Sequence, residues 1–368
     1  MRFIIRNMKH RNYDAERIAI IRFLCLKGAI IVKKILSVIL AIIMVLACFT
    51  GCGGGGDTAD AAFPAKDING IVQWGEGGGT DNIVRPLCIQ ADELIDKNII
   101  VQNMTGGTGA IATQYVHKQT ADGYTLLLGA ENPALYGILG TSELTYDNFE
   151  TVLLIGSEDV SIVVPKDSPY NSVTELIAGA KAAPGELVFS ATGRGGCQWQ
   201  SCGLISAVTG AEFTQLPLDG DADCLAAVMG GTADVTTIKS SQVMEAYAAG
   251  TVKVLATLTA EQVEVLPGVK PIVEELPGFA EYLPFGPFYG VFVPEGTPAE
   301  AVASLADTFS AAFETEAYQE VLKNLNIVPL GLKGEEANQY IADWTASTAK
   351  ALYSAGLIDK SPAELGLA

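Results

Sequence analysis

The chain has 368 residues, of which 49% are hydrophobic and 18% are charged, and this composition predicts a globular protein long enough for two domains while excluding global disorder. After Cys52 the chain carries 14 basic and 40 acidic residues, a net charge of −26. Because so acidic a surface has no basic stripe to neutralise phosphates, nucleic acid and anionic lipid head groups are excluded as partners.

Residues 1–51 are typical of an export signal. Two lysines precede an apolar run at 35–47, which as a helix would rise only about 20 Å and is too short for a bilayer core of about 30 Å. Gly51, Cys52 and four glycines follow, so the segment resembles a bacterial lipoprotein signal peptide. The resemblance implies that Cys52 carries a lipid and that 52–66 form a tether. We interpret the stretch before the two lysines as a superfluous N-terminal extension.

Beyond the tether, apolar runs that suit buried strands alternate with helical patterns. The expected strands of this first part are 68–74, 99–102 and 125–128, and helices are expected to follow the glycine turns at 75–81 and 106–109. The residues of the first helix expected to face the core are Ile83, Leu87, Ile89 and Leu94. This alternation is the pattern of βαβ units and predicts an α/β fold with mainly parallel sheets.

Two long extended stretches, 152–164 and 285–293, interrupt the alternation. Between them a new series of units begins with a helix capped by Ser172, and later includes a second glycine turn at 192–197 that precedes a helix. We interpret the extended stretches as two crossings between domains. The prediction is a discontinuous domain 1, formed by 67–155 and 290–368, and a domain 2 at 156–289, with a ligand cleft between them.

The two glycine turns at 75–81 and 192–197 are the candidate binding elements. A glycine turn between a strand and a helix leaves backbone N–H groups unpaired at the positive end of the helix dipole, which suits an anion. Either turn alone could be an ordinary tight turn, because glycine is common in such turns. If the two domains face each other, however, the turns could hold the two ends of one ligand.

A dinucleotide-binding enzyme is an alternative interpretation. The stretch Gly107-Thr108-Gly109-Ala110-Ile111-Ala112 matches G-x-G-x-x-A after a strand, and Glu131 follows about one strand further on. The first βα turn lacks this pattern, and an exported chain would meet little NAD. We therefore predict that the protein is not an enzyme and has no cofactor.

The cysteines and histidines exclude most metal chemistry. The cysteines after Cys52 are Cys88, Cys197, Cys202 and Cys224, and they form no CxxC spacing. Cys197 and Cys202 are five apart on a predicted helix and point to different faces, so no disulfide is expected. We expect four small core residues, with a free thiol at Cys197 as the alternative. A single histidine after Cys52 excludes a histidine-based zinc site and Ser-His-Asp catalysis.

An ordered set of short motifs spans about residues 66–350. The motifs are GGGTD (77–81), NMTGGTG (103–109), ADGYTLLLG (121–129), NPALY (132–136), TEL (174–176), APGEL (183–187), GGTAD (230–234) and VPEGTP (293–298). Together they resemble the tripartite tricarboxylate transporter substrate-binding receptors, also called the Bug family. The resemblance implies a two-domain fold like that of type II periplasmic binding proteins, which closes on a carboxylate ligand.

The resemblance also implies which residues bind the ligand. Backbone amides of the two glycine turns would hold its carboxylates, at Gly77, Gly78, Thr80 and Asp81 and at Gly193, Arg194, Gly195 and Cys197. This chain departs from the family at Glu76 and Asp219, two acids near the site that count against a plain dicarboxylate. We expect a carboxylate that also carries a cationic or hydroxylated group, such as an amino acid. Trp74 and Trp199 flank the turns and could stack on it.

The predicted function is that of a monomeric, lipid-anchored extracytoplasmic receptor that delivers a small carboxylate to the permease subunits of a tripartite tricarboxylate-type transporter. Membrane association would be through the lipid alone. The alternative is a sensory input protein of the same fold that presents its ligand to a membrane kinase. Permease genes beside the gene for this chain would favour transport, whereas an adjacent two-component system would favour sensing.

Overall fold

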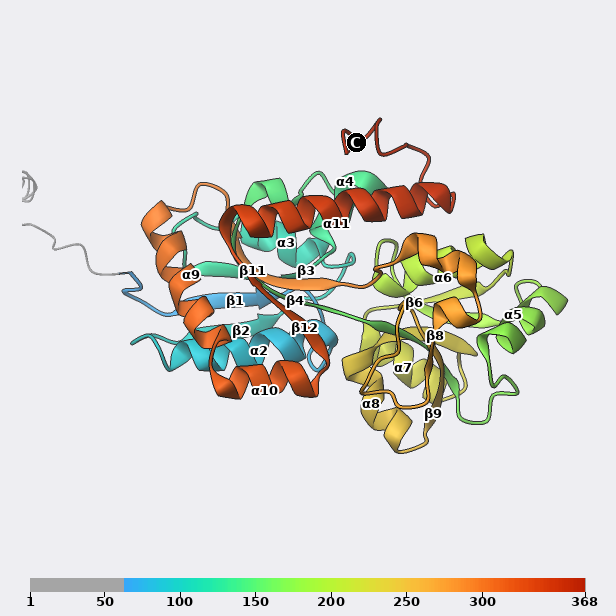
Figure 1. The fold of residues 1–368 in the computed structure, drawn as a ribbon. Coiled ribbons are helices and arrows are strands. Elements are labelled where there is room, and N and C mark those ends of the chain that lie inside the picture. Colours follow the sequence, from blue (N-terminus) through green and yellow to red (C-terminus); the bar gives the residue numbers. More distant parts are fainter. Residues whose placement is uncertain (1–62, 368) are drawn as a thin grey trace, which may run out of the picture. The chain divides into compact units, whose positions relative to one another are not determined.

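The computed structural model describes residues 63–367. The expected signal peptide, the N-terminal extension and the lipidation site at Cys52 lie outside these residues. Within 63–367 no helix is both long and apolar enough to cross a bilayer. The described part contains two six-stranded sheets, each covered by helices on both faces (Figure 1).

The first sheet has the strand order β12-β4-β11-β3-β1-β2. Its strands are β1 (Ile68–Val72), β2 (Ile99–Asn103), β3 (Thr125–Ala130), β4 (Phe149–Glu158), β11 (Phe288–Pro294) and β12 (Ile327–Leu332). One face packs on α2 (Gly79–Asp92), α9 (Ala299–Phe313) and α10 (Glu316–Asn324). The other packs on α3 (Ala110–His117), α4 (Pro133–Leu139) and α11 (Gly334–Ser354), and a 3-10 helix, η1 (Tyr146–Asn148), precedes β4. We call this part lobe 1.

The second sheet has the order β10-β9-β5-β8-β6-β7. Its strands are β5 (Val160–Pro165), β6 (Val188–Thr192), β7 (Thr214–Leu218), β8 (Val235–Lys239), β9 (Val252–Thr257) and β10 (Lys270–Pro271). One face packs on α5 (Val173–Ala182), α6 (Cys197–Thr209) and the 3-10 helices η2 (Ile272–Glu274) and η3 (Pro277–Tyr282). The other packs on α7 (Asp221–Met229) and α8 (Ser240–Ala248). We call this part lobe 2.

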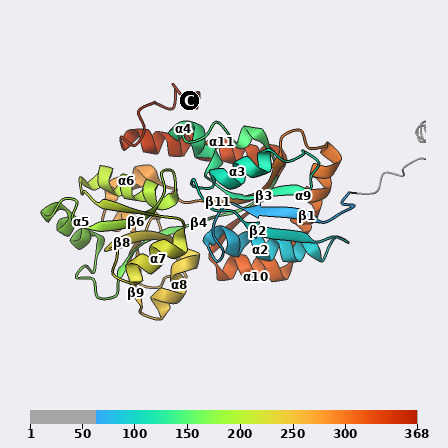
Figure 2. The same ribbon diagram turned by 180° about the vertical axis from the view of Figure 1, so that it is seen from behind.

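The sheets are mixed, which corrects the expectation of mainly parallel pairing. Five of the ten strand pairings are parallel and five are antiparallel. Every antiparallel pairing includes β4, β5 or β11, which are the strands of the two extended crossings. β11 and β12 run against the other strands of the first sheet, and β5 runs against the other strands of the second. β5 and β11 enter their sheets from the other lobe, whereas β4 runs with the βαβ strands of lobe 1 and leads out of that lobe. Figure 1 and Figure 2 show, from opposite sides, the two crossings between the lobes next to β4 and β11.

The packing face of α2 differs from the expected one. Ile83 and Leu87 are fully buried as predicted, but Ile89 is 54% exposed. At 3.6 residues per turn, a position two residues from Leu87 points to nearly the opposite side of the helix. Leu94 is 49% exposed because the helix ends before it, at Asp92. The α5 helix, in contrast, begins as predicted, with the Ser172 hydroxyl accepting a hydrogen bond from the Glu175 N–H (3.1 Å).

Both ends of the described chain are bound to the rest of it. Phe63 packs on Tyr124 with ring centroids 4.9 Å apart, and the Ala65 N–H donates to the Tyr124 hydroxyl (2.7 Å). The last residues of the expected tether therefore belong to lobe 1. Near the C-terminus, the Trp344 indole of α11 donates to the Gly286 carbonyl (3.1 Å) in the second crossing, and Leu357 packs against the core of lobe 2. The exact domain limits stay a prediction.

Candidate functional site

The two glycine turns lie where lobe 1 meets lobe 2. The Gln242 side chain of lobe 2 donates to the Gly77 carbonyl of the first turn (3.1 Å). Reciprocally, the Asn132 side chain of lobe 1 donates to the Gly195 carbonyl of the second turn (3.3 Å). The described form therefore has the lobes in contact across both turns.

The first turn is held by the carboxylate of Asp81. Gly77 has a positive φ of 72°, and its N–H donates to Asp81 Oδ2 (3.0 Å). Asp81 also accepts from Arg85 (2.6 Å) and Asn103 (3.0 Å). Burial alone would raise the pKa of Asp81, but these hydrogen bonds lower it overall. The Asp81 side chain is thus committed to the turn and is not available to a ligand.

The second turn leads into α6 through Gly195, which has a φ of 91°. The Gly196 N–H donates to the Gly193 carbonyl (2.8 Å), and Cys197 begins the helix. Cys197 is buried and free, as are Cys88, Cys202 and Cys224, which confirms the prediction of four core cysteines. Burial raises the pKa of the Cys197 thiol well above its ordinary value, so this free thiol is not a reactive thiolate.

A cavity of about 180 Å³ borders the second turn and Trp74, the residue that precedes the first turn. It is lined by Trp74, Gly106, Gly107, Thr108, Gly193, Pro217, Leu218 and Asp219. The structure thus brings together three predicted site residues, Trp74, Gly193 and Asp219. It also adds the turn at 106–108, which the sequence analysis had not included among the predicted ligand-binding residues.

The other eight predicted ligand-binding residues do not line this cavity; they are Glu76, Gly77, Gly78, Thr80, Asp81, Arg194, Gly195 and Cys197. Arg194 is exposed, and its guanidinium carbon lies 5.8 Å from the centre of the Trp199 ring. Glu76 is also exposed. The Trp74 indole donates to the Asn132 side chain (3.2 Å), so one edge of this ring is already hydrogen-bonded.

A buried polar cluster that sequence reasoning missed lies beside the N-terminus of α2. Lys239, at the end of β8, contacts the Asp221 carboxylate (2.6 Å), and the Gln198 side chain donates to the other Asp221 oxygen (2.5 Å). Two further buried carboxyls, Glu131 and Glu158, contribute to the charge around Lys239. The position of these residues in the sequence could have indicated the cluster. Glu131, Glu158 and Lys239 each lie at the carboxyl end of a buried strand, which is where α/β sheets bind ligands.

Burial and charge set the protonation of the cluster. Burial alone would raise the pKa of Asp221, but Lys239, Gln198 and the Gly79 N–H lower it overall. Burial works against the charge of Lys239, but Asp221 raises its pKa overall. For Glu131 and Glu158, burial dominates and raises each pKa to about 7. At neutral pH the cluster therefore holds one firm ion pair and two carboxyls close to half ionisation.

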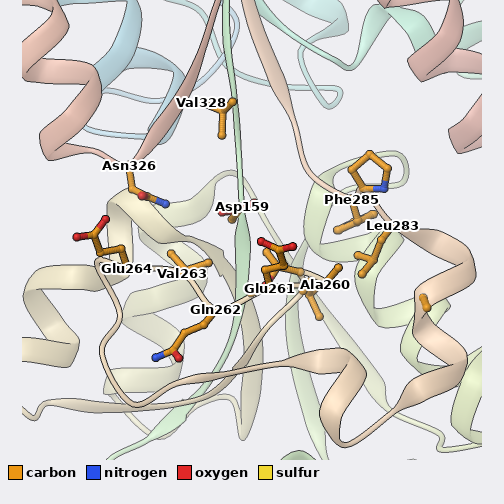
Figure 3. Close-up of a pocket in the computed structure, with 14 residues that line it drawn as sticks. Asp159, Ala260, Glu261, Gln262, Val263, Glu264, Leu283, Phe285, Asn326 and Val328 are labelled. Carbon is orange, nitrogen blue, oxygen red and sulfur yellow. Dashed lines mark hydrogen bonds between the residues drawn. The ribbon is translucent and has the colours of Figure 1, made fainter.

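Two larger cavities suit a carboxylate less well than the space between the turns. One, of about 620 Å³, lies beside the first crossing and includes Asp159, Glu261 and Glu264 (Figure 3). The other, of about 640 Å³, includes Asp147, Glu150 and Glu295. Neither lining contains a lysine or arginine. Each would set a ligand carboxylate among like charges, which disfavours binding. Residues 63–367 also contain no group of three potential metal ligands.

Comparison with known proteins identifies the family of the chain. Residues 83–357 match the family described as "Tripartite tricarboxylate transporter family receptor". The chain is 27% identical over 285 residues to Protein BugT of Bordetella pertussis, covering 76% of this chain and 86% of BugT.

Solved structures share the fold. A protein of R. palustris solved with adipate has a TM-score of 0.74 and 27% identity, with 80% of this chain and 98% of that one covered. The periplasmic binding protein BugD has a TM-score of 0.76 and 23% identity, with 81% of this chain and 100% of BugD covered. Both have the two-lobed α/β periplasmic-binding-protein fold, which confirms the predicted fold class.

Proposed function

Because the chain belongs to the tripartite tricarboxylate transporter receptor family, we propose that this extracytoplasmic solute receptor captures a small carboxylate-containing ligand and delivers it to membrane permease subunits. The family consists of solute-binding receptors rather than enzymes, so the oxidoreductase alternative is set aside. The relative solved with adipate, a carboxylate, supports this ligand class.

One observation carries the proposal. The cavity of about 180 Å³ is lined by residues of both lobes, with Trp74 just before the first turn and Gly193 within the second. The first N–H groups of α6 have no partners within the helix, and the helix dipole favours an anion at this end. A carboxylate in this space would be held by elements from both lobes, so binding would favour the closed form.

A thermal-shift screen tests the proposal. A ligand at 100 times its Kd adds about 2.7 kcal/mol to the free energy of unfolding, which raises the melting temperature measurably. The screen compares matched compounds: glutamine with glutamate, asparagine with aspartate, and hexanoate with adipate. We expect at least one carboxylate to stabilise the exported protein. If none does at millimolar concentration, the proposed function fails.

Arg194 is proposed to reach the bound carboxylate from the second turn. Its guanidinium is exposed and makes no ion pair in the described residues, so it is available to form a forked contact. Arg194→Ala is expected to weaken ligand binding roughly 10- to 150-fold, with little change in the melting temperature of the ligand-free protein. The control is Lys333→Ala, which removes an exposed charge beside Asp307 in lobe 1. Equal affinities for the two variants would exclude Arg194 from the site.

Anchoring through Cys52 is a separate proposal. Because the lipid would be attached through this thiol, Cys52→Ser is expected to move the protein from the membrane fraction to a soluble or uncleaved form. Cys48→Ser is the matched control and is expected to leave the protein in the membrane fraction. The measurement is immunoblotting of fractionated cells. The reverse pattern would assign the cleavage site to Cys48.

A further inference from the structure

The carboxylate of Asp221 occupies the anion position at the N-terminus of α2. It lies at the start of α7 in lobe 2, yet its Oδ2 atom is beside Gly79, the first residue of α2 in lobe 1. Lys239 (2.6 Å) and Gln198 (2.5 Å) donate hydrogen bonds to its two oxygens. Two donors of lobe 2 therefore hold, beside the first residue of α2, a carboxylate that belongs to the protein itself.

No space remains for a ligand carboxylate at this point. A Cβ placed on Gly79 would lie 3.0 Å from the Lys239 side chain, 3.4 Å from the Tyr289 hydroxyl and 3.5 Å from Asp221 Oδ2. Asp221 and Lys239 are both about nine-tenths buried, and among the ion pairs within 63–367 theirs is the one with both side chains buried. Any anion that replaced Asp221 would have to break this pair.

We propose that Asp221 takes the place of one ligand carboxylate and so makes the receptor selective for ligands that carry a single carboxylate. The inference rests on the proposed function and names the ligand class of the same site. The ligand carboxylate would bind at the second glycine turn, where Gly193 borders the cavity, and the rest of the ligand would lie between Trp74 and Asp219.

The charge around the cavity supports the same selectivity. A second carboxylate on the ligand would meet Asp219 at the cavity wall, a contact between like charges, and Asp221 already fills the position at the α2 end. A neutral or cationic group at that end of the ligand avoids the repulsion. This chain therefore differs from the relative solved with adipate, whose ligand carries a carboxylate at each end.

Asp221→Asn tests the inference through selectivity. The side chain keeps its size, but Lys239 loses its counter-ion and becomes free to pair with a second ligand carboxylate. We expect the ratio of diacid to monoacid affinity, measured by calorimetry for glutamate against glutamine and for adipate against hexanoate, to rise about tenfold or more. Asp223→Asn, which changes an exposed acid on the same helix turn, is the control and should leave the ratio unchanged.

The double variant Asp221→Asn/Lys239→Met removes both charges of the pair. It should not gain affinity for diacids, because the gain requires the unpaired Lys239 ammonium. An unchanged ratio in Asp221→Asn, or an equal gain in the double variant, would overturn the inference.

A second measurement does not depend on knowing the ligand. Asp221→Gly removes the internal carboxylate and leaves a space for formate. We expect Asp221→Gly to melt at a lower temperature than the wild type, and formate, but not chloride at the same concentration, to restore much of the loss. Formate should have little effect on the wild type and on Asp223→Gly. An equal response of all three proteins to formate would contradict an anion position filled by Asp221.

The outcomes separate the two proposals. If no carboxylate binds the wild type, the proposed function fails, while the response of Asp221→Gly to formate still decides the role of Asp221. If carboxylates bind but the selectivity and formate results are negative, the receptor function stands and the inference about Asp221 fails.

Discussion

Lys239→Met is expected to lower the free energy of unfolding by about 3–5 kcal/mol. The substitution leaves the Asp221 carboxylate buried without its cation, at 2.6 Å from the position that the ammonium held. Glu131 and Glu158 would then face Asp221 with no positive charge among them. Methionine fills a similar volume, so most of the loss would come from the uncompensated charge rather than from a cavity.

Denaturant unfolding measures this loss, with Lys270→Met as the matched control. Lys270 also pairs with an acid, Glu274 (3.5 Å), but the two side chains are 63% and 51% exposed. An exposed pair contributes about 0–1 kcal/mol, so the control should lose little stability. Asp221→Asn/Lys239→Met should recover much of the loss, because neither charge is then buried alone. Equal losses for the two lysine variants would show that the buried pair does not stabilise the closed form.

The protein is expected to be more stable near pH 5 than near pH 8. Glu131 and Glu158 have pKa values raised by burial from 4.5 to about 7. Between these values the unfolded chain has released the two protons while the folded protein still holds them. Stability therefore falls as the pH rises from about 4.5 through 7 and levels off above that range, by about 3 kcal/mol for each carboxyl.

Below about pH 4.5 the stability is instead expected to fall as the pH falls. The pKa values of Asp81 and Asp221 are lowered by their hydrogen-bond and charge partners in spite of burial, so the stability that they contribute is lost as acid protonates them. A stability maximum is therefore expected near pH 4–5. Glu131→Gln and Glu158→Gln should each flatten the decline between pH 5 and 8, with the exposed Glu300→Gln as the control. A decline of the same size in all three variants would assign it to other groups.

The sequence correctly predicted those structural elements that are determined by a few adjacent residues. The glycine turns, the crossings and the Ser172 cap each depend on a few adjacent residues, and they lie where the sequence placed them. The face of α2 was missed at Ile89 because a run of apolar residues fits more than one helical register. The direction of the β5 and β11 strands was missed because each enters its sheet from the other lobe.

The candidate site was predicted in part for a related reason. Trp74 adjoins the first glycine turn and Gly193 lies within the second, so the glycine-rich sequence of the turns was enough to predict both residues. Asp221 and Lys239 are 18 residues apart, and their contact with Gly79 joins segments of different lobes. Nothing in the local pattern shows that an acid, a lysine and a helix N-terminus will meet. The sequence shows that charged residues stand at the ends of strands. Which of them form an ion pair, and therefore what they do, can be seen only in the folded structure.

Identification of the retained ligand tests the central claim most directly. The exported protein is incubated with equal amounts of glutamine, glutamate, asparagine, aspartate, hexanoate and adipate, and separated from unbound compounds. It is then denatured to release what it has kept. Mass spectrometry should find one or more carboxylates of unchanged mass, enriched in those with a single carboxylate. Retention of no carboxylate, or recovery of a compound of altered mass, would contradict a receptor that binds and returns a small carboxylate.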